Sequence, residues 1–269
     1  RMRTRYYIAL CAAERQQNGA RDLLESFVED YPNSIYLNDI HFALGTVLEK
    51  DGEYAEAYEH LLTVNPNELP YSRQDEYYFR TGYAAFQNGN TDEAYDYFRQ
   101  CTGDPAYAPH ATYYKSYIDY SRGDLNAAKE GFKSIADVPA YEPIIPFYLL
   151  QIEFRQGNYD YVIEHGVPLM TKATGTREIE IARILSESYF RKQMYAEALD
   201  QIENYERLGG EMGVEELYLA GYSNYNRLYY TKASGQLSAV AEQGGELGQN
   251  AAFHLGDCYL KLGDKQKAL

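Results

Sequence analysis

Residues able to perform acid–base, nucleophilic or metal chemistry are scattered along this sequence. None of its five histidines has a cysteine, serine or second histidine at a helical spacing suited to a metal or nucleophile site: His41, His60, His110, His165 and His254. Cys11, Cys101 and Cys258 are far apart and are interpreted as small buried side chains. Adjacent acids such as Asp92-Glu93 are typical of solvated helix starts. No phosphate-binding glycine loop or nucleophile-elbow motif occurs. We therefore expect no metal, no cofactor and no enzymatic activity.

The composition narrows the possible partners. The chain has 269 residues, with 25 basic and 40 acidic side chains and a formal charge of -15. A nucleic-acid or anionic-membrane surface would need clustered Lys and Arg, so both are disfavoured. No apolar run approaches the roughly 18 residues that a membrane-spanning helix requires.

Two columns of small residues recur along the chain and predict its elements. The first column contains Gly45, Gly82, Ser116, Ser186, Gly221 and Gly256, with Ile8 and Leu150 as exceptions, at intervals of 34 to 37 residues. The second column follows twelve residues later and contains Ala20, Ala57, Ala94, Ala128, Val162, Ala198, Ala233 and Ala268. Such a period indicates a repeat protein.

Between the two columns lies a predicted turn. Gly52, Gly89, Gly123, Gly157 and Gly263 each follow a helical pattern, as expected at a helix C-terminus. Each repeat is therefore predicted to be a hairpin of two antiparallel helices, which approach closely only where small side chains face each other. Proline or paired glycines separate successive hairpins, as at Pro70 and Gly209-Gly210.

A unit of about 34 residues with these features resembles the tetratricopeptide repeat family, and Phe42 to Ala57 is the best local match. The resemblance implies an all-α, right-handed superhelical solenoid with about seven and a half repeats in a single array over residues 1–269. The expected repeats span 1–37, 38–74, 75–108, 109–142, 143–178, 179–213, 214–248 and 249–269. Repeat five departs from the pattern at Leu150, Val162, Gly166 and Pro168, so its second helix is expected to be distorted or shortened.

The ends and one junction suggest a larger context. The chain stops one residue after Ala268, so we expect the array to continue or a disordered tail to follow. Glu29 to Ser34 resembles repeats of bacterial envelope proteins of the outer-membrane assembly lipoprotein and TolA-binding types. This junction favours the periplasm or cell envelope, with the cytoplasm as the alternative.

The first helix of each hairpin is expected to line the concave face of the array. Three positions on each helix should point inward, and most of them are aromatic or Arg. The predicted partner-binding residues are Phe42, Phe79, Tyr83, Phe86, Tyr113, Tyr117, Tyr120, Phe147, Phe154, Arg155, Arg183, Phe190, Arg191, Tyr218, Tyr222 and Tyr225. The middle-position rings Tyr83, Tyr117 and Tyr222 are expected to be exposed.

Two interpretations stay open for each of these side chains. The aromatic rings suit recognition at low ordering cost, but they also fit ordinary packing between repeats. The arginines could hold a partner carboxylate, or they could pair with Glu180 and Glu187. The family's Lys and Asn pattern for clamping a chaperone C-terminus is absent.

Three functions follow, and the first is favoured. The protein is predicted to be a non-catalytic scaffold that binds a segment of another protein in an aromatic-lined groove. The alternatives are a polysaccharide- or glycan-binding envelope module and a structural spacer in a larger assembly.

Overall fold

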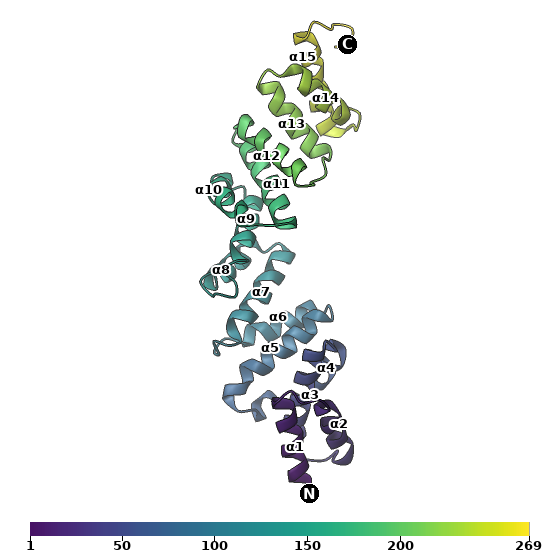
Figure 1. The fold of residues 1–269 in the computed structure, drawn as a ribbon, viewed down its shortest axis with the longest axis vertical. Coiled ribbons are helices and arrows are strands. Elements are labelled where there is room, and N and C mark those ends of the chain that lie inside the picture. The colour runs from purple at the N-terminus through teal and green to yellow at the C-terminus, as the bar shows by residue number, and fades with distance from the viewer. Residues whose placement is uncertain (269) are drawn as a thin grey trace. The chain divides into compact units, whose positions relative to one another are not determined.

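A computed structural model of the protein describes residues 1–268, and within these residues every regular element is a helix (Figure 1). The first helices of the hairpins are α1 (Met2–Glu14), α3 (Leu37–Asp51), α5 (Tyr71–Gln87), α7 (Ala108–Arg122), α9 (Ile145–Arg155), α11 (Thr176–Arg191), α13 (Val214–Asn226) and α15 (Gly245–Lys261). The second helices are α2 (Ala20–Asp30), α4 (Tyr54–Leu62), α6 (Thr91–Gln100), α8 (Leu125–Ser134), α10 (Tyr159–Met170), α12 (Tyr195–Arg207) and α14 (Tyr230–Ala241). A short 3-10 helix, η1 (Pro66–Glu68), precedes α5. The predicted all-α hairpin fold is confirmed.

The chain divides into two compact parts, Arg1–Glu142 and Pro143–Leu269, which we call the N-terminal and C-terminal halves. Within each half, each first helix that a second helix follows packs against that second helix, as α3 does against α4 and α13 against α14. First helices of successive hairpins also touch, as α3 and α5 do, and α11 and α13. The boundary falls between predicted repeats four and five, and a single array over 1–269 stays a prediction.

The first small-residue column lies where the two helices of a hairpin come closest. A Cβ atom on Gly45 would lie 2.6 Å from Leu61 Cγ, and one on Gly221 would lie 2.8 Å from Leu237 Cγ. In both hairpins the bulky partner stands sixteen residues after the glycine. The second column is buried as well, with Ala57 and Ala233 both fully shielded from solvent. The two columns therefore record the close helix–helix contact that the sequence predicts.

Repeat five keeps this contact by exchanging the sizes of the two partners. Leu150 stands where other repeats have a small residue and is fully buried. Sixteen residues later comes Gly166, whose added Cβ would lie 3.5 Å from Leu150 Cδ1 and 2.9 Å from Leu185 Cδ2. The expected shortening is wrong, because α10 runs for 12 residues through Pro168 whereas α4 has 9. Pro168 lies in the last turn, so the helix ends soon after it.

Repeat one has a different register from the one predicted. Ile8 is 52% exposed, whereas Ala9 is buried at 1%. Ala9 also stands seven residues before Gln16, which has a left-handed φ of 52°. In repeats two to four the same interval separates each small residue from its turn glycine, as from Gly45 to Gly52. The small residue of repeat one is therefore Ala9, and its connection to Ala20 is one residue shorter than in the other repeats.

The predicted turns adopt the left-handed conformation. Gly52, Gly89 and Gly123 have φ values of 83°, 80° and 84°. The same position holds Gln193 at 59° and Leu228 at 65° in repeats six and seven, where glycine is absent. After α15, residues 265–268 form a turn rather than the start of the helix expected around Ala268. Leu269 lies outside the described residues.

Candidate binding site

The first helices of the C-terminal half surround a cavity of about 540 Å³. It is lined by α11, α13 and α15, and we call it the α11–α15 pocket. Its walls are Arg183, Ser186, Glu187, Phe190, Arg191, Glu215, Glu216, Tyr218, Leu219, Glu246, Leu247 and Asn250. Four of the predicted partner-binding residues, Arg183, Phe190, Arg191 and Tyr218, therefore lie around one cavity.

Aromatic packing fixes one side of this pocket. The Phe190 ring lies 6.5 Å from the Tyr218 ring and 5.6 Å from the Tyr222 ring, measured between centroids. Tyr222 is partly buried and also packs 4.8 Å from His254. The Tyr225 hydroxyl donates a 2.8 Å hydrogen bond to Asp257. Burial and contacts on several sides hold these rings in place, so they form a rigid apolar support.

The two arginines of the pocket already bind carboxylates of their own helix. Arg183 donates to both carboxylate oxygens of Glu180, at 2.7 and 3.0 Å, and this pairing raises the pKa of Arg183. Arg191 donates to Glu187 at 3.0 Å. Arg155 is exposed and does not line the pocket. The structure therefore shows the local pairing that was the alternative to a carboxylate-binding arginine group.

In the N-terminal half, the predicted aromatic residues pack on one another around a ring that the prediction missed. Tyr114 lies 6.4 Å from Phe79, 5.3 Å from Tyr83 and 5.3 Å from Phe86. Tyr83 also contacts Tyr54 at 5.8 Å, so it is partly buried rather than exposed. The cluster joins α5 to α7.

The remaining predicted aromatics are partly buried. Tyr117 lies 6.0 Å from Phe86, and Tyr113 stacks on Tyr141 at 4.8 Å. In the C-terminal half, Phe147 lies under Arg177 at 5.7 Å and Phe154 lies under Arg183 at 5.9 Å. Tyr120 is partly buried as well. None of the five is a fully exposed ring, and the expectation that Tyr117 is exposed is wrong.

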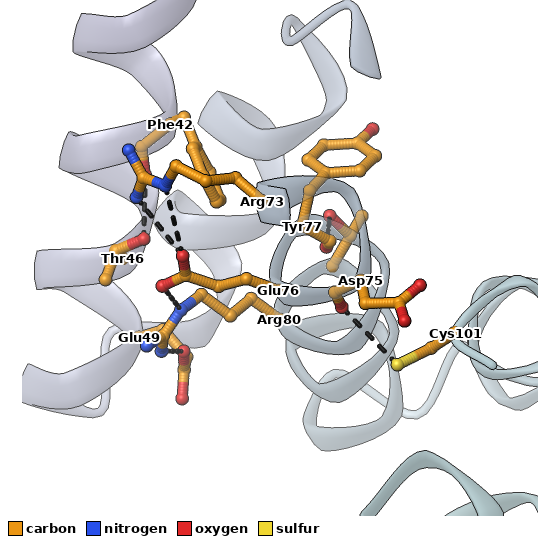
Figure 2. A network of polar contacts seen from close by, with 10 residues as sticks. Phe42, Thr46, Glu49, Arg73, Asp75, Glu76, Tyr77, Arg80 and Cys101 are labelled. Carbon is orange, nitrogen blue, oxygen red and sulfur yellow. Dashed lines mark hydrogen bonds and ion pairs between the residues drawn. The ribbon is translucent and has the colours of Figure 1, made fainter. Parts of the chain in front are cut away.

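Figure 2 shows why Phe42 differs from the other predicted residues. Its ring is fully buried, and the Arg73 guanidinium covers it at 4.5 Å. Arg73 donates to Glu76, which also accepts a 2.9 Å hydrogen bond from Arg80. Arg80 in turn pairs with Glu49 across the α3–α5 contact. Phe42 is therefore a core residue beneath an ion network, and we remove it from the candidate partner-binding set.

This network is partly shielded from water. The side chains of Arg80 and Glu49 are only 12% and 10% exposed. Burial raises the pKa of Glu76, but Arg80 and Arg73 outweigh it and hold that pKa below its ordinary value. The positive and negative charges balance within the group, so its evident role is to join the second and third hairpins.

Four residues that affect the charge and access of the α11–α15 pocket were not predicted from the sequence. Glu215 and Glu216 lie in the first turn of α13, Glu246 lies in the first turn of α15, and Asn250 lies one turn later. Glu215-Glu216, like other adjacent acids, was interpreted as a solvated helix start. The positions of the four residues in the sequence could have indicated them, because each lies about one or two turns before the residues of its own helix that are expected to face inward.

Three further features concern metal ligands, cysteines and helix hydrophobicity. Within residues 1–268, no three His, Cys, Asp or Glu side chains lie close enough together to hold a metal ion. Cys101 and Cys258 are buried as predicted, but Cys11 is exposed. Over the same residues, no helix is both long and apolar enough to cross a bilayer.

The fold and its repeat spacing define an array of antiparallel helical hairpins. The tetratricopeptide repeat model matches residues 3–34, and a second model of the same repeat matches residues 75–103. These segments correspond to the first and third hairpins. The first and third hairpins therefore match the tetratricopeptide repeat. No curated protein matches the sequence.

Solved structures agree with this fold at low sequence identity. A tetratricopeptide repeat protein from Parabacteroides merdae is 14% identical, with 96% of this chain and 98% of that chain covered and a TM-score of 0.52. The C-terminal part of a repeat-containing protein from Cytophaga hutchinsonii is 14% identical, with coverages of 91% and 98% and a TM-score of 0.57. A signal transduction ATPase with a tetratricopeptide repeat sensor from Pyrococcus horikoshii is 17% identical, with coverages of 92% and 41% and a TM-score of 0.50.

Proposed function

We propose that this protein is a non-catalytic scaffold that binds a segment of another protein, and that the α11–α15 pocket is its main contact. Tetratricopeptide repeats are in general protein-interaction scaffolds, which supports the class of function. The observation that carries the specific site is the 540 Å³ cavity, which unites four residues predicted to bind a partner. A cavity of this size accommodates a few side chains of a bound segment.

The N-terminal aromatic cluster supports this function less directly. Its rings contact one another across α5 and α7, so much of their area is already used in packing. The α11–α15 pocket differs because it is open and combines apolar with charged walls. Such mixed surfaces are typical of peptide-binding grooves, where an apolar centre is surrounded by polar groups.

The experiment fills the pocket without removing any packed side chain. Asn250 is exposed and lines the cavity, so Asn250→Trp places an indole in it. Gln249→Trp is the matched control, because Gln249 is exposed on the same helix but does not line the cavity. Circular dichroism first establishes that both variants are folded.

Affinity capture from a cell extract, followed by mass spectrometry, then compares the three proteins. We expect a partner that intact protein and Gln249→Trp retain and that Asn250→Trp loses. Equal retention by both variants would rule out the pocket as the contact.

A further inference from the structure

The walls of the α11–α15 pocket carry more negative than positive charge. Two arginines, Arg183 and Arg191, face four glutamates in the lining. Glu187 is paired with Arg191, and Glu180, outside the lining, is paired with Arg183. Glu215, Glu216 and Glu246 take part in no ion pair among residues 1–268. The arginines are therefore neutralised by carboxylates that are not these three.

All three glutamates lie at the N-terminal ends of helices. Glu215 and Glu216 are in the first turn of α13, and Glu246 is in the first turn of α15. The positive end of a helix dipole stabilises a negative side chain there. Glu216 also lies near enough to Arg183 to contribute to raising the pKa of that arginine. Glu215 and Glu246 are exposed at the pocket.

The apolar residues of the pocket also restrict which segment of a partner can bind there. Phe190, Tyr218, Leu219 and Leu247 line it together with the charged residues. An aromatic ring face attracts a Lys or Arg side chain, and the aliphatic stem of that side chain covers apolar surface. An acidic segment would instead meet uncompensated carboxylates, which costs affinity.

We infer that the α11–α15 pocket binds a basic segment of a partner protein, in which Lys or Arg side chains lie beside an apolar residue. The surplus of carboxylates around an apolar floor is the charge complementarity that selects this occupant. The inference rests on the proposed function, since it names the chemistry of the segment that the scaffold holds.

The first test leaves the sequence of the segment open. A random dodecapeptide phage library is selected on the intact protein, and clones that also bind Asn250→Trp are removed. We expect the surviving sequences to be enriched in Lys and Arg next to apolar residues. Survivors that are neutral or acidic would overturn the basic occupant and leave the scaffold function standing. No enrichment over Asn250→Trp would overturn both.

The second test separates the pocket from the general acidity of the chain. Fluorescence anisotropy measures the affinity of one selected peptide for the triple variant Glu215→Gln, Glu216→Gln and Glu246→Gln. The control triple variant is Glu164→Gln, Glu197→Gln and Glu242→Gln, which removes the same charge at exposed positions outside the pocket.

We expect the pocket variant to bind about tenfold more weakly, from three partly screened charge contacts, and the control to change by less than about twofold. The difference should shrink as salt is raised. Equal losses in the two variants would show that the peptide responds only to net charge, which contradicts the inference.

Discussion

At the scale of single residues, two histidines face each other within the second hairpin. His41 Nδ1 and His60 Nδ1 are 3.0 Å apart, and the two rings stack at 5.2 Å. Burial lowers the pKa of both, and His60 further lowers that of His41. Around His60, Glu25, Glu56 and Glu59 act in the opposite direction, and Arg21 acts in the same direction as burial. The net result is that the fold favours two neutral rings.

This pair predicts a loss of stability in weak acid. In the unfolded chain each histidine titrates near pH 6.5, and in the folded chain it titrates lower. The unfolded state therefore binds more protons just below pH 6.5, so the pair's contribution is complete above that pH and declines as pH falls below it. Thermal unfolding at pH 7.5 and 5.5 measures this decline.

The double variant His41→Gln and His60→Gln should show a smaller decline between the two pH values. His165→Gln is the control, because His165 is exposed and lies in a different hairpin. An identical decline in wild type and double variant would mean that other groups cause it.

At the scale of elements, the two glycines inside second helices of the C-terminal half have opposite surroundings. A Cβ on Gly166 would lie 2.9 Å from Leu185 Cδ2, whereas one on Gly235 would meet nothing within 4 Å. We expect Gly166→Ala to destabilise the protein by about 1–3 kcal/mol through overpacking. Gly235→Ala should stabilise it by about 0.5–1 kcal/mol, because alanine loses less backbone entropy in a helix. Urea unfolding of both variants tests the pair, and a loss of stability in Gly235→Ala would be the contrary result.

The turn between the helices offers a second prediction at this scale. Gln193 and Leu228 adopt φ values of 59° and 65°, a conformation that costs non-glycine residues roughly 1–2 kcal/mol. Replacing Leu228, which is 68% exposed, with Gly should stabilise the protein, by about 1 kcal/mol at most. Gly123→Ala imposes the reverse change at φ 84° and should destabilise by a similar amount. Calorimetric melting temperatures that move in the same direction for both variants would contradict this explanation.

These elements also show what could be predicted from the sequence and what could not. The spacing of Gly45, Gly82 and Gly221 predicted the hairpins because a close helix contact restricts residue size. The same rule failed at Ile8, where a connection one residue shorter shifts the register without changing the composition. The rule also failed at Leu150, because a close contact restricts the combined size of two facing residues. In repeat five the small residue of that pair is Gly166, on the second helix.

The candidate site was predicted less completely for a related reason. Inward positions were assigned from one helix at a time, and four of the residues assigned in this way line one cavity: Arg183, Phe190, Arg191 and Tyr218. Whether a ring stays accessible depends on the next helix, and that information is not local. Phe42 is covered by Arg73 from α5, and Tyr114 on α7 packs against Tyr83 on α5.

At the scale of the whole molecule, packing is local along the chain. Helix α3 contacts α1, α2, α4 and α5, and α14 contacts α13 and α15. In such an array stability is close to a sum of repeat and nearest-neighbour contributions, so damage in one repeat should remain near it. Each half also has its own buried cluster, with Leu48 in one and Leu237 in another.

Two matched cavity variants test this locality. Leu48 in α3 and Leu237 in α14 are both fully buried, so each substitution by Ala should cost about 2–5 kcal/mol. Leu48→Ala should speed amide hydrogen exchange in α3 to α5 and leave α13 and α14 protected as in wild type. Leu237→Ala should produce the reverse pattern, because its contacts lie in α13 to α15. Uniform loss of protection in either variant would mean that the chain unfolds as one cooperative body, which contradicts unfolding confined to neighbouring repeats.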